Sequence, residues 1–357
     1  MADKKVYVYI GRFQPFHNAH AHVIERAAKK ADAVIVLVGS AYRARDIKNP
    51  FTFDERRSII SNWYAGIVGG ANTHLRIMPV RDQQYNNGKW IQSVQEQVSQ
   101  ALIDIGFSED VCDIVVTGSD RDDSTWYLHA FPQWGQDLIE PVPKGQDLNA
   151  TGLRKVLFSG GTIEEIDDSI PYSTVEFLRK FIGTHHHARL KKQYRVIAEG
   201  KSAWANTPHH VIFNTVDAVV IQSGHVLVVE RGAEPGQGLW ALPGGFLNPD
   251  EWLIEASMRE LIEETKIKVT ENILRGSYRA REIFDDPNRS LRGRTITTAH
   301  LFRLDDSKPL PKVKGSDDAA KAFWLPINKA RANSELWFED HLDILDWAMG
   351  VKDVGVI

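Results

Sequence analysis

The stretch VYVYIGRFQPFHNAH, residues 6–20, joins a strand-like run to a turn and then to the start of a helix. Residues 6–10 are β-branched or aromatic, which favours a strand. Residues 20–30 place Ala, Val and Ile at helical spacing. Gly11 permits a tight turn between the two elements. Because a helix start offers free N–H groups and a positive dipole end, the turn is a candidate phosphate-binding site.

Further strands follow the same pattern. Residues 33–38 and 113–118 are apolar runs that end in Gly39 and Gly118, as expected of buried parallel strands. Strands that alternate with helices predict an α/β fold with a doubly wound, Rossmann-like sheet. Ligands of such sheets bind at the carboxyl ends of the strands, which is where these glycine turns lie.

Two histidines follow the first turn. His17 and His20 are three residues apart, so both side chains can face the same side of the helix start and donate to phosphate oxygens. Two alternatives remain open at this point: one capping and one core histidine, or a zinc pair, for which no third ligand is evident nearby.

The turn resembles the His-x-Gly-His motif of the nucleotidyltransferase superfamily, with Ala19 in place of the glycine. A longer match, at residues 11–17, 39–41, 49–56 and 149–154, is similar to the archaeal-type nicotinamide-nucleotide adenylyltransferases and covers about residues 5–180. The segment 118–134 resembles the bacterial fused versions of this enzyme, and we assign no role to its individual residues.

The resemblance implies in-line attack of nicotinamide mononucleotide on the α-phosphorus of ATP, with catalysis by alignment and charge neutralisation. The implied catalytic residues are Arg12, His17, His20 and Arg154. The implied substrate-binding residues are Gly11, Phe13, Gln14, Lys48, Trp90 and Thr151.

Three points of this assignment carry alternatives. Lys48 stands where the family usually has arginine, so it neutralises phosphate without a bidentate fork. Trp90 matches a tryptophan that stacks on nicotinamide, but any of the 10 tryptophans can also be a core residue. The acceptor could instead be phosphopantetheine or a choline- or glycerol-type phosphate, against which the extended match and Trp90 argue.

The pattern breaks at residues 184–206, a polar, basic stretch with three consecutive histidines that we interpret as a solvated linker rather than a metal site. The predicted domains are therefore 1–183 and 207–357. In the second, residues 211–221 and 226–229 read as a hairpin, followed by a helix near 250–264 and strands near 273–284 and 295–304. This order predicts an α+β domain.

A glutamate-rich helix is the main feature of the second domain. Asn248 as N-cap, Pro249 at the first position and Glu251 form a predicted helix start. Glu260, Glu263 and Glu264 fall on one face, where their repulsion favours a bound Mg²⁺ or Mn²⁺. Arg259 is spaced to pair with Glu263. The alternative is a solvated acidic face.

The register from Gly245 through Glu251 to Glu264 resembles the Nudix box, with Lys266 in place of its closing glycine. The resemblance implies an α/β/α Nudix fold in which Gly245, Glu260, Glu263 and Glu264 hold the cation. Residues 239–246 and 284–295 resemble the ADP-ribose pyrophosphatase group. The general base is not fixed, and Asp317 and Asp318 are candidates only.

The substrate of this half keeps alternatives. Arg292 and Arg294 hold the terminal ribose phosphate of ADP-ribose or are exposed strand charges. The Nudix half could instead hydrolyse another dinucleotide or a sugar nucleotide, or act as an ADP-ribose-binding sensor. The fusion of the two modules is similar to bacterial bifunctional enzymes of NAD metabolism.

Composition sets further limits. A net charge of −4 argues against nucleic-acid binding, and the single cysteine, Cys112, excludes an intramolecular disulfide and a cysteine-based zinc cluster. No apolar run reaches the roughly 20 residues of a membrane-spanning helix. We therefore expect a cytoplasmic enzyme with ATP, nicotinamide mononucleotide and ADP-ribose as substrates, and homo-oligomerisation stays open.

Overall fold

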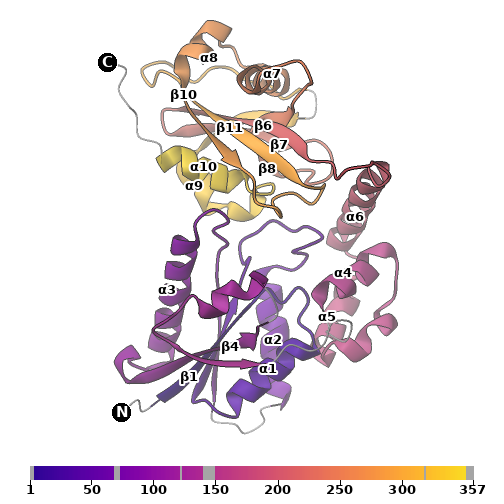
Figure 1. Cartoon of the computed structure of the whole chain (residues 1–357), viewed down its shortest axis with the longest axis vertical. Helices are drawn as coiled ribbons and strands as arrows, with labels where there is room; N and C mark the ends of the chain where they lie inside the picture. The colour runs from indigo at the N-terminus through magenta and orange to yellow at the C-terminus, as the bar shows by residue number, and fades with distance from the viewer. Residues whose placement is uncertain (1–3, 68–72, 121–122, 140–148, 317–318, 351–357) are drawn as a thin grey trace. The chain divides into compact units, whose positions relative to one another are not determined.

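The computed structural model describes the whole chain except residues 1–3, 68–72, 121–122, 140–148, 317–318 and 351–357 (Figure 1). It divides into two compact units, Met1–Lys191 and Lys192–Ile357. Each unit is built on its own sheet. Within the described residues, no helix combines the length and the apolar character needed to cross a bilayer.

The first unit contains a five-stranded parallel sheet with the order β3-β2-β1-β4-β5. Its strands are β1 (Lys4–Gly11), β2 (Ala33–Val38), β3 (His74–Pro79), β4 (Cys112–Ser119) and β5 (Gly135–Ile139). Its helices are α1 (Asn18–Ala28), α2 (Phe53–Ile67), α3 (Asn87–Ile105), α4 (Ala150–Ser159) and α5 (Tyr172–Phe181). The predicted doubly wound α/β fold is confirmed.

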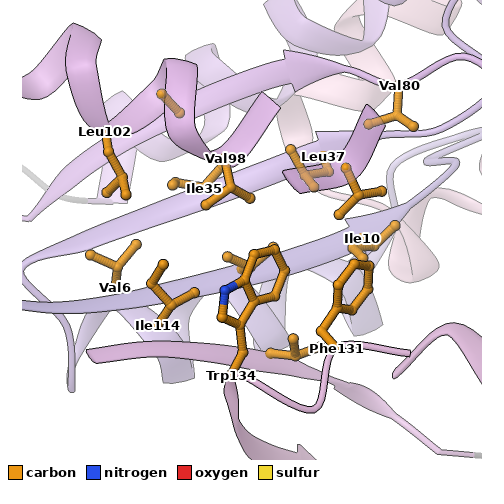
Figure 2. Close-up of a cluster of buried hydrophobic side chains, with 14 of the residues drawn as sticks. Val6, Ile10, Ile35, Leu37, Val80, Val98, Leu102, Ile114, Phe131 and Trp134 are labelled. Carbon is orange, nitrogen blue, oxygen red and sulfur yellow. The ribbon is translucent and has the colours of Figure 1, made fainter. Parts of the chain in front are cut away.

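Both faces of this sheet are covered, which explains why its strands are continuously apolar. On one face, Val6 and Ile35 pack with Val98 and Leu102 of α3 and with Trp134 (Figure 2). On the other face, the alternate strand residues pack against α1 and α2. The order of the strands brings the carboxyl ends of β1 and β2 together, so the turns after Gly11 and Val38 are neighbours.

The second unit contains a seven-stranded mixed sheet. Its main path has the order β10-β11-β6-β7-β12, with β8 on β7 and β9 on β6. Its strands are β6 (Phe213–Gln222), β7 (His225–Arg231), β8 (Trp240–Ala241), β9 (Gly244–Phe246), β10 (Tyr278–Phe284), β11 (Thr295–Arg303) and β12 (Ala319–Pro326). Its helices are α7 (Leu253–Thr265), α8 (Glu271–Ser277), α9 (Ile327–Ala332) and α10 (His341–Gly350).

The expected hairpin is present, because β6 and β7 pair antiparallel across Ser223 and Gly224, both with positive φ. Two local predictions were wrong. Residues 271–277 form α8, so the strand expected from 273 begins only at Tyr278. Helix α7 begins at Leu253 after Trp252 rather than at Asn248, whose backbone N–H instead donates to Glu251 Oε1 in a preceding turn (2.8 Å).

The predicted linker, 184–206, contains helix α6 (His185–Ala203). His187 is buried, and one of its ring nitrogens lies 3.2 Å from the carbonyl oxygen of Leu157. Of the three histidines, this one is therefore a packing residue of the first unit. The boundary between the two compact units falls inside α6.

Candidate functional sites

The turn after β1 is held by an unusual backbone path. Phe13 has a positive φ of 52°, and the Gln14–Pro15 peptide is cis. A Cβ on Gly11 would lie 2.9 Å from the Phe13 ring. The glycine is thus required for the room that Phe13 occupies, and the structure gives no sign that Gly11 needs a left-handed conformation.

The two predicted histidines lie together. His17 precedes α1 and is buried, and its ring stacks on the His20 ring with centroids 3.6 Å apart. The backbone N–H of His17 donates to Nδ1 of His20 (3.3 Å). The Phe13 ring packs edge-on against the His20 ring, with centroids 4.8 Å apart, and this contact restricts the orientation of His20.

The second predicted signature reaches the same turn. Arg154 of α4 donates to the carbonyl oxygen of Gln14 (2.7 Å) and to Thr151 Oγ1 (3.1 Å). Asn149 caps this helix by accepting from Gly152 N–H (2.9 Å). The fold therefore joins residues about 140 positions apart in one site, with the start of α4 beside the β1–α1 turn.

Positive charge accumulates at this turn. Burial, followed by the charge of Arg12, lowers the pKa of Lys48 below its usual range. The same two causes lower the pKa of Arg154 to about 10. Arg12 itself is exposed. Cations that repel one another in a partly buried site are stabilised by a bound anion, and a polyphosphate supplies several negative charges at once.

Two predicted substrate-binding residues serve the scaffold in this structure. Gln14 is buried, and its side-chain amide both donates to the carbonyl oxygen of Phe51 (2.8 Å) and accepts from its N–H (3.0 Å). Phe13 is also buried, with its ring against His20. Both residues therefore support the β1–α1 turn by packing and hydrogen bonding.

Trp90 lies in the first turn of α3 and is half-buried. Its ring lies 5.5 Å from Trp126 and 6.3 Å from Phe131. Because Trp126 is 42% exposed, the pair forms a partly accessible aromatic wall, which suits ring stacking, while Trp90 also packs on the core.

Sequence reasoning missed the residue that connects the two glycine turns. The fully buried Arg56 of α2 donates to the carbonyl oxygens of Arg12 (2.6 Å), Gly39 (2.7 Å) and Ser40 (3.1 Å). Its only sequence signal was its position in the family-like segment 49–56. Asp82 was also missed; it accepts from both the N–H and the hydroxyl of Ser40.

In the second unit, Arg259 organises the glutamates of α7. It forms a bidentate pair with Glu251 (2.9 and 2.7 Å) and donates to Glu260 (2.9 Å) and Glu263 (3.0 Å). These bonds hold the pKa of Arg259 above its usual range. The predicted pairing with Glu263 is therefore present, as one of three.

Two glutamates meet strand β9. Glu264 is buried and accepts from Gly244 N–H (3.1 Å), and a Cβ on Gly245 would lie 2.4 Å from Glu260 Oε1. Burial raises the pKa of Glu264 to about 8 and also raises the pKa of Glu260. The more exposed Glu263 lies at the rim.

This donor set fits a hard divalent cation, because burial disfavours the charged carboxylates of Glu260 and Glu264 and oxygen is the ligand such ions prefer. Among the described residues, no three histidine, cysteine or acidic side chains are arranged around one point. Three of the four glutamates are instead turned to Arg259, so cation binding would require their carboxylates to rotate.

The two arginines predicted to bind the terminal ribose phosphate, Arg292 and Arg294, have different surroundings. Arg292 stands over the Phe246 ring at 5.6 Å and 3.7 Å from Glu339, next to β9. Arg294 donates to the carbonyl oxygen of Asp285 and is occupied there. Asp317, Asp318, Arg121 and Asp122 lie outside the described residues.

Two further features surround this site. Lys266 ends α7 with a positive φ of 45°, so a lysine adopts the left-handed conformation for which glycine is favoured. Sequence reasoning missed Asp217, which accepts from Thr297 (2.6 Å) and lies so close that a Cβ on Gly244 would be 2.6 Å from it. An acid inside the apolar run of β6 was the available signal.

Comparisons with known proteins identify a family for each unit. The cytidylyltransferase-like family matches residues 8–127, and the NUDIX domain family matches residues 212–348. The nicotinamide/nicotinic acid mononucleotide adenylyltransferase of Acinetobacter baylyi is 31% identical over 53% of this chain and 92% of its own length. The nicotinamide-nucleotide adenylyltransferase of Thermococcus onnurineus is 29% identical over 49% and 83%.

Similarity to solved structures extends over both units. One such structure is a bifunctional NMN adenylyltransferase/ADP ribose pyrophosphatase from Francisella tularensis, determined with AMP and a manganese ion. It has a TM-score of 0.86 and 32% identity, and the match covers 97% of this chain and 99% of that one. The chain therefore belongs to the family of bifunctional nicotinamide-nucleotide adenylyltransferases fused to a Nudix hydrolase of the ADP-ribose pyrophosphatase group.

Proposed function

We propose that the first unit transfers AMP from ATP to nicotinamide mononucleotide, giving NAD and pyrophosphate, and that the second hydrolyses ADP-ribose to AMP and ribose 5-phosphate. The observation that carries the first activity is the gathering of Arg12, Lys48 and Arg154 at the β1–α1 turn, which leads into the stacked His17–His20 pair. The Acinetobacter and Francisella proteins bear names that support both activities.

In the transfer, a phosphate oxygen of the mononucleotide attacks the α-phosphorus of ATP, and the bond from that phosphorus to the β-bridging oxygen breaks. Pyrophosphate leaves with the bonding electrons. His17, His20 and Arg12 would face the developing negative charge, while Thr151 and Arg154 hold the β- and γ-phosphates. No covalent enzyme intermediate is needed, and alignment supplies much of the rate.

In the hydrolysis, water adds to a phosphorus of the diphosphate and the bond to the bridging oxygen breaks. Glu260, Glu264 and the backbone of Gly245 would hold Mg²⁺ or Mn²⁺, with Glu263 at the rim. When bound, the cation neutralises the diphosphate and lowers the pKa of water. Arg259 would keep the glutamates near β9, and Arg292 would lie beside the diphosphate.

The proposed partners are small molecules. We expect no nucleic-acid or membrane partner and a cytoplasmic location, and analytical ultracentrifugation of the full chain would decide whether it forms a homo-oligomer. Trp90, with Trp126, is the proposed stacking surface for the nicotinamide ring.

The two activities can be separated in the full-length protein. His17→Ala should abolish NAD synthesis and leave ADP-ribose hydrolysis unchanged, and Glu264→Gln should do the reverse. Synthesis is followed with ATP and nicotinamide mononucleotide, and hydrolysis by chromatography of AMP. A folded variant that loses both activities would contradict two independent sites. Binding of ADP-ribose without turnover would favour a sensor over a hydrolase.

A further inference from the structure

A cavity of about 540 Å³ lies in the second unit, between the end of α6 with the segment that follows it, the start of β6, and the loop before β11. This volume is within the range of small-molecule sites, roughly 300–1,000 Å³. The side chains that give the cavity its chemistry are Lys201, Trp204, His209, His210, Phe213 and Arg292. None of the described residues that line it is acidic.

One side of the cavity is aromatic. Trp204 is 50% exposed, and its indole meets the Phe213 ring edge-on at 5.9 Å. Phe213 meets Phe246, also 50% exposed, in the same manner at 5.8 Å. A row of accessible rings thus runs from the end of α6 to strand β9. Nucleic-acid bases stack on such rings because every base presents a π-face.

The cationic side connects the cavity to the glutamates. Arg292 lines the cavity and also stands over the Phe246 ring at 5.6 Å. Phe246 directly follows Gly245, against which Glu260 lies. A ligand with its base in the cavity would therefore pass its phosphates along Arg292 toward the glutamate face of α7.

We propose that this cavity is the base-binding subsite of the Nudix half and that Trp204, outside the Nudix box, stacks on the base of the nucleoside diphosphate substrate. The assignment rests on the proposed hydrolytic function. It also fixes a direction: the nucleoside lies between Trp204 and Arg292, and the second sugar extends beyond the glutamates.

The test uses the full-length protein with Mn²⁺ and ADP-ribose, comparing wild type, Trp204→Ala and Trp204→Phe. Loss of base stacking weakens binding on the order of tenfold, so Trp204→Ala should raise KM for ADP-ribose about tenfold with kcat within twofold. Trp204→Phe should retain most of the affinity. Ile273→Ala, an equally exposed apolar truncation on α8, is the matched control and should behave as wild type.

Two product inhibitors separate stacking from a general structural effect. The inhibition constant of AMP should rise in Trp204→Ala in parallel with KM, whereas that of ribose 5-phosphate, which has no base, should stay unchanged. Equal increases for both inhibitors would overturn the subsite, as would an unchanged KM. In either case, intact hydrolysis by the wild type would leave the proposed function standing.

Failure of the proposed function has its own signature. A wild-type protein that hydrolyses no ADP-ribose is tested for AMP binding by calorimetry in an Arg154→Ala background, which weakens the first site. Binding that depends on Trp204 would support the subsite and refute the proposed substrate. Absence of AMP and ADP-ribose binding would refute both.

Discussion

Arg56 offers the sharpest test of how the first site is built. Its guanidinium donates to four backbone carbonyl oxygens, those of Thr52, Arg12, Gly39 and Ser40, at 2.6–3.1 Å and with no exposed surface. A lysine at this position has three donors on one atom and cannot span the same fork. We expect Arg56→Lys to lose at least two of these bonds.

The expected loss of stability follows from the backbone carbonyl oxygens that would lose their hydrogen-bond donor. Each buried acceptor left without a donor costs about 1–3 kcal/mol, so Arg56→Lys should destabilise the first unit by roughly 2–6 kcal/mol. That is below the whole stability of a typical domain, about 5–15 kcal/mol, so the unit should remain folded. The guanidinium of Arg56 acts as a spacer that links the turns at Arg12 and Gly39. Without it the two turns would shift, and a misplacement of about 1 Å can cost on the order of 100-fold in rate.

The assay measures NAD synthesis at 25 °C beside ADP-ribose hydrolysis on the same sample. Synthesis should fall about 100-fold and hydrolysis should stay within twofold of wild type. Arg57→Lys is the matched control, since Arg57 is the next residue of α2 but is exposed, pairs with Asp54 (2.9 Å) and lies over the Phe53 ring (5.4 Å) at the surface. A folded Arg56→Lys protein with synthesis within threefold of wild type would refute the spacer role.

Three further changes probe the second unit. Gly245→Ala places a Cβ 2.4 Å from Glu260 Oε1, so hydrolysis should fall roughly 10- to 100-fold with synthesis intact; unchanged hydrolysis would contradict the contact. Lys266→Gly should raise stability by up to about 1 kcal/mol, because the left-handed conformation costs an L-residue more than glycine; a lower melting temperature would contradict this. Burial lowers the pKa of His300 from 6.5 to about 4. The free energy of unfolding is therefore highest above pH 6.5 and falls as the pH drops toward 4, because the unfolded chain takes up a proton that the folded protein does not. His300→Leu should reduce the decrease in the free energy of unfolding between pH 7 and pH 4 by about 3 kcal/mol, as measured by thermal unfolding at these pH values.

Local periodicity explains what the sequence predicted well. The i, i+3 and i+4 spacings bring His17 to His20 and Arg259 to Glu263 wherever a helix forms, so these contacts need no knowledge of the fold. Alternation of strands and helices then places the glycine turns at one sheet edge. Arg154 entered the candidate site by a different route, the family resemblance of residues 149–154.

The remaining features depend on tertiary approach. Arg56 faces three carbonyls only because β1 and β2 are adjacent, and nothing within its own helix distinguishes it from Arg57. Gln14 carries the polarity of a binding residue, yet its amide is used by Phe51. The start of α7 was misplaced because Asn248 and Glu251 form a capping-like turn one step before the helix.

The two sites bury groups of opposite charge. In the first unit, buried Lys48 and Arg154 have lowered pKa values because burial and the charge of Arg12 disfavour their charged forms. In the second unit, buried Glu260 and Glu264 have raised pKa values because burial disfavours theirs. The first site therefore favours a polyphosphate directly. For the proposed hydrolysis, the second would take up a cation before it can favour a diphosphate, so one chain can build a dinucleotide at one site and cleave a sugar-linked nucleoside diphosphate at a site of opposite charge.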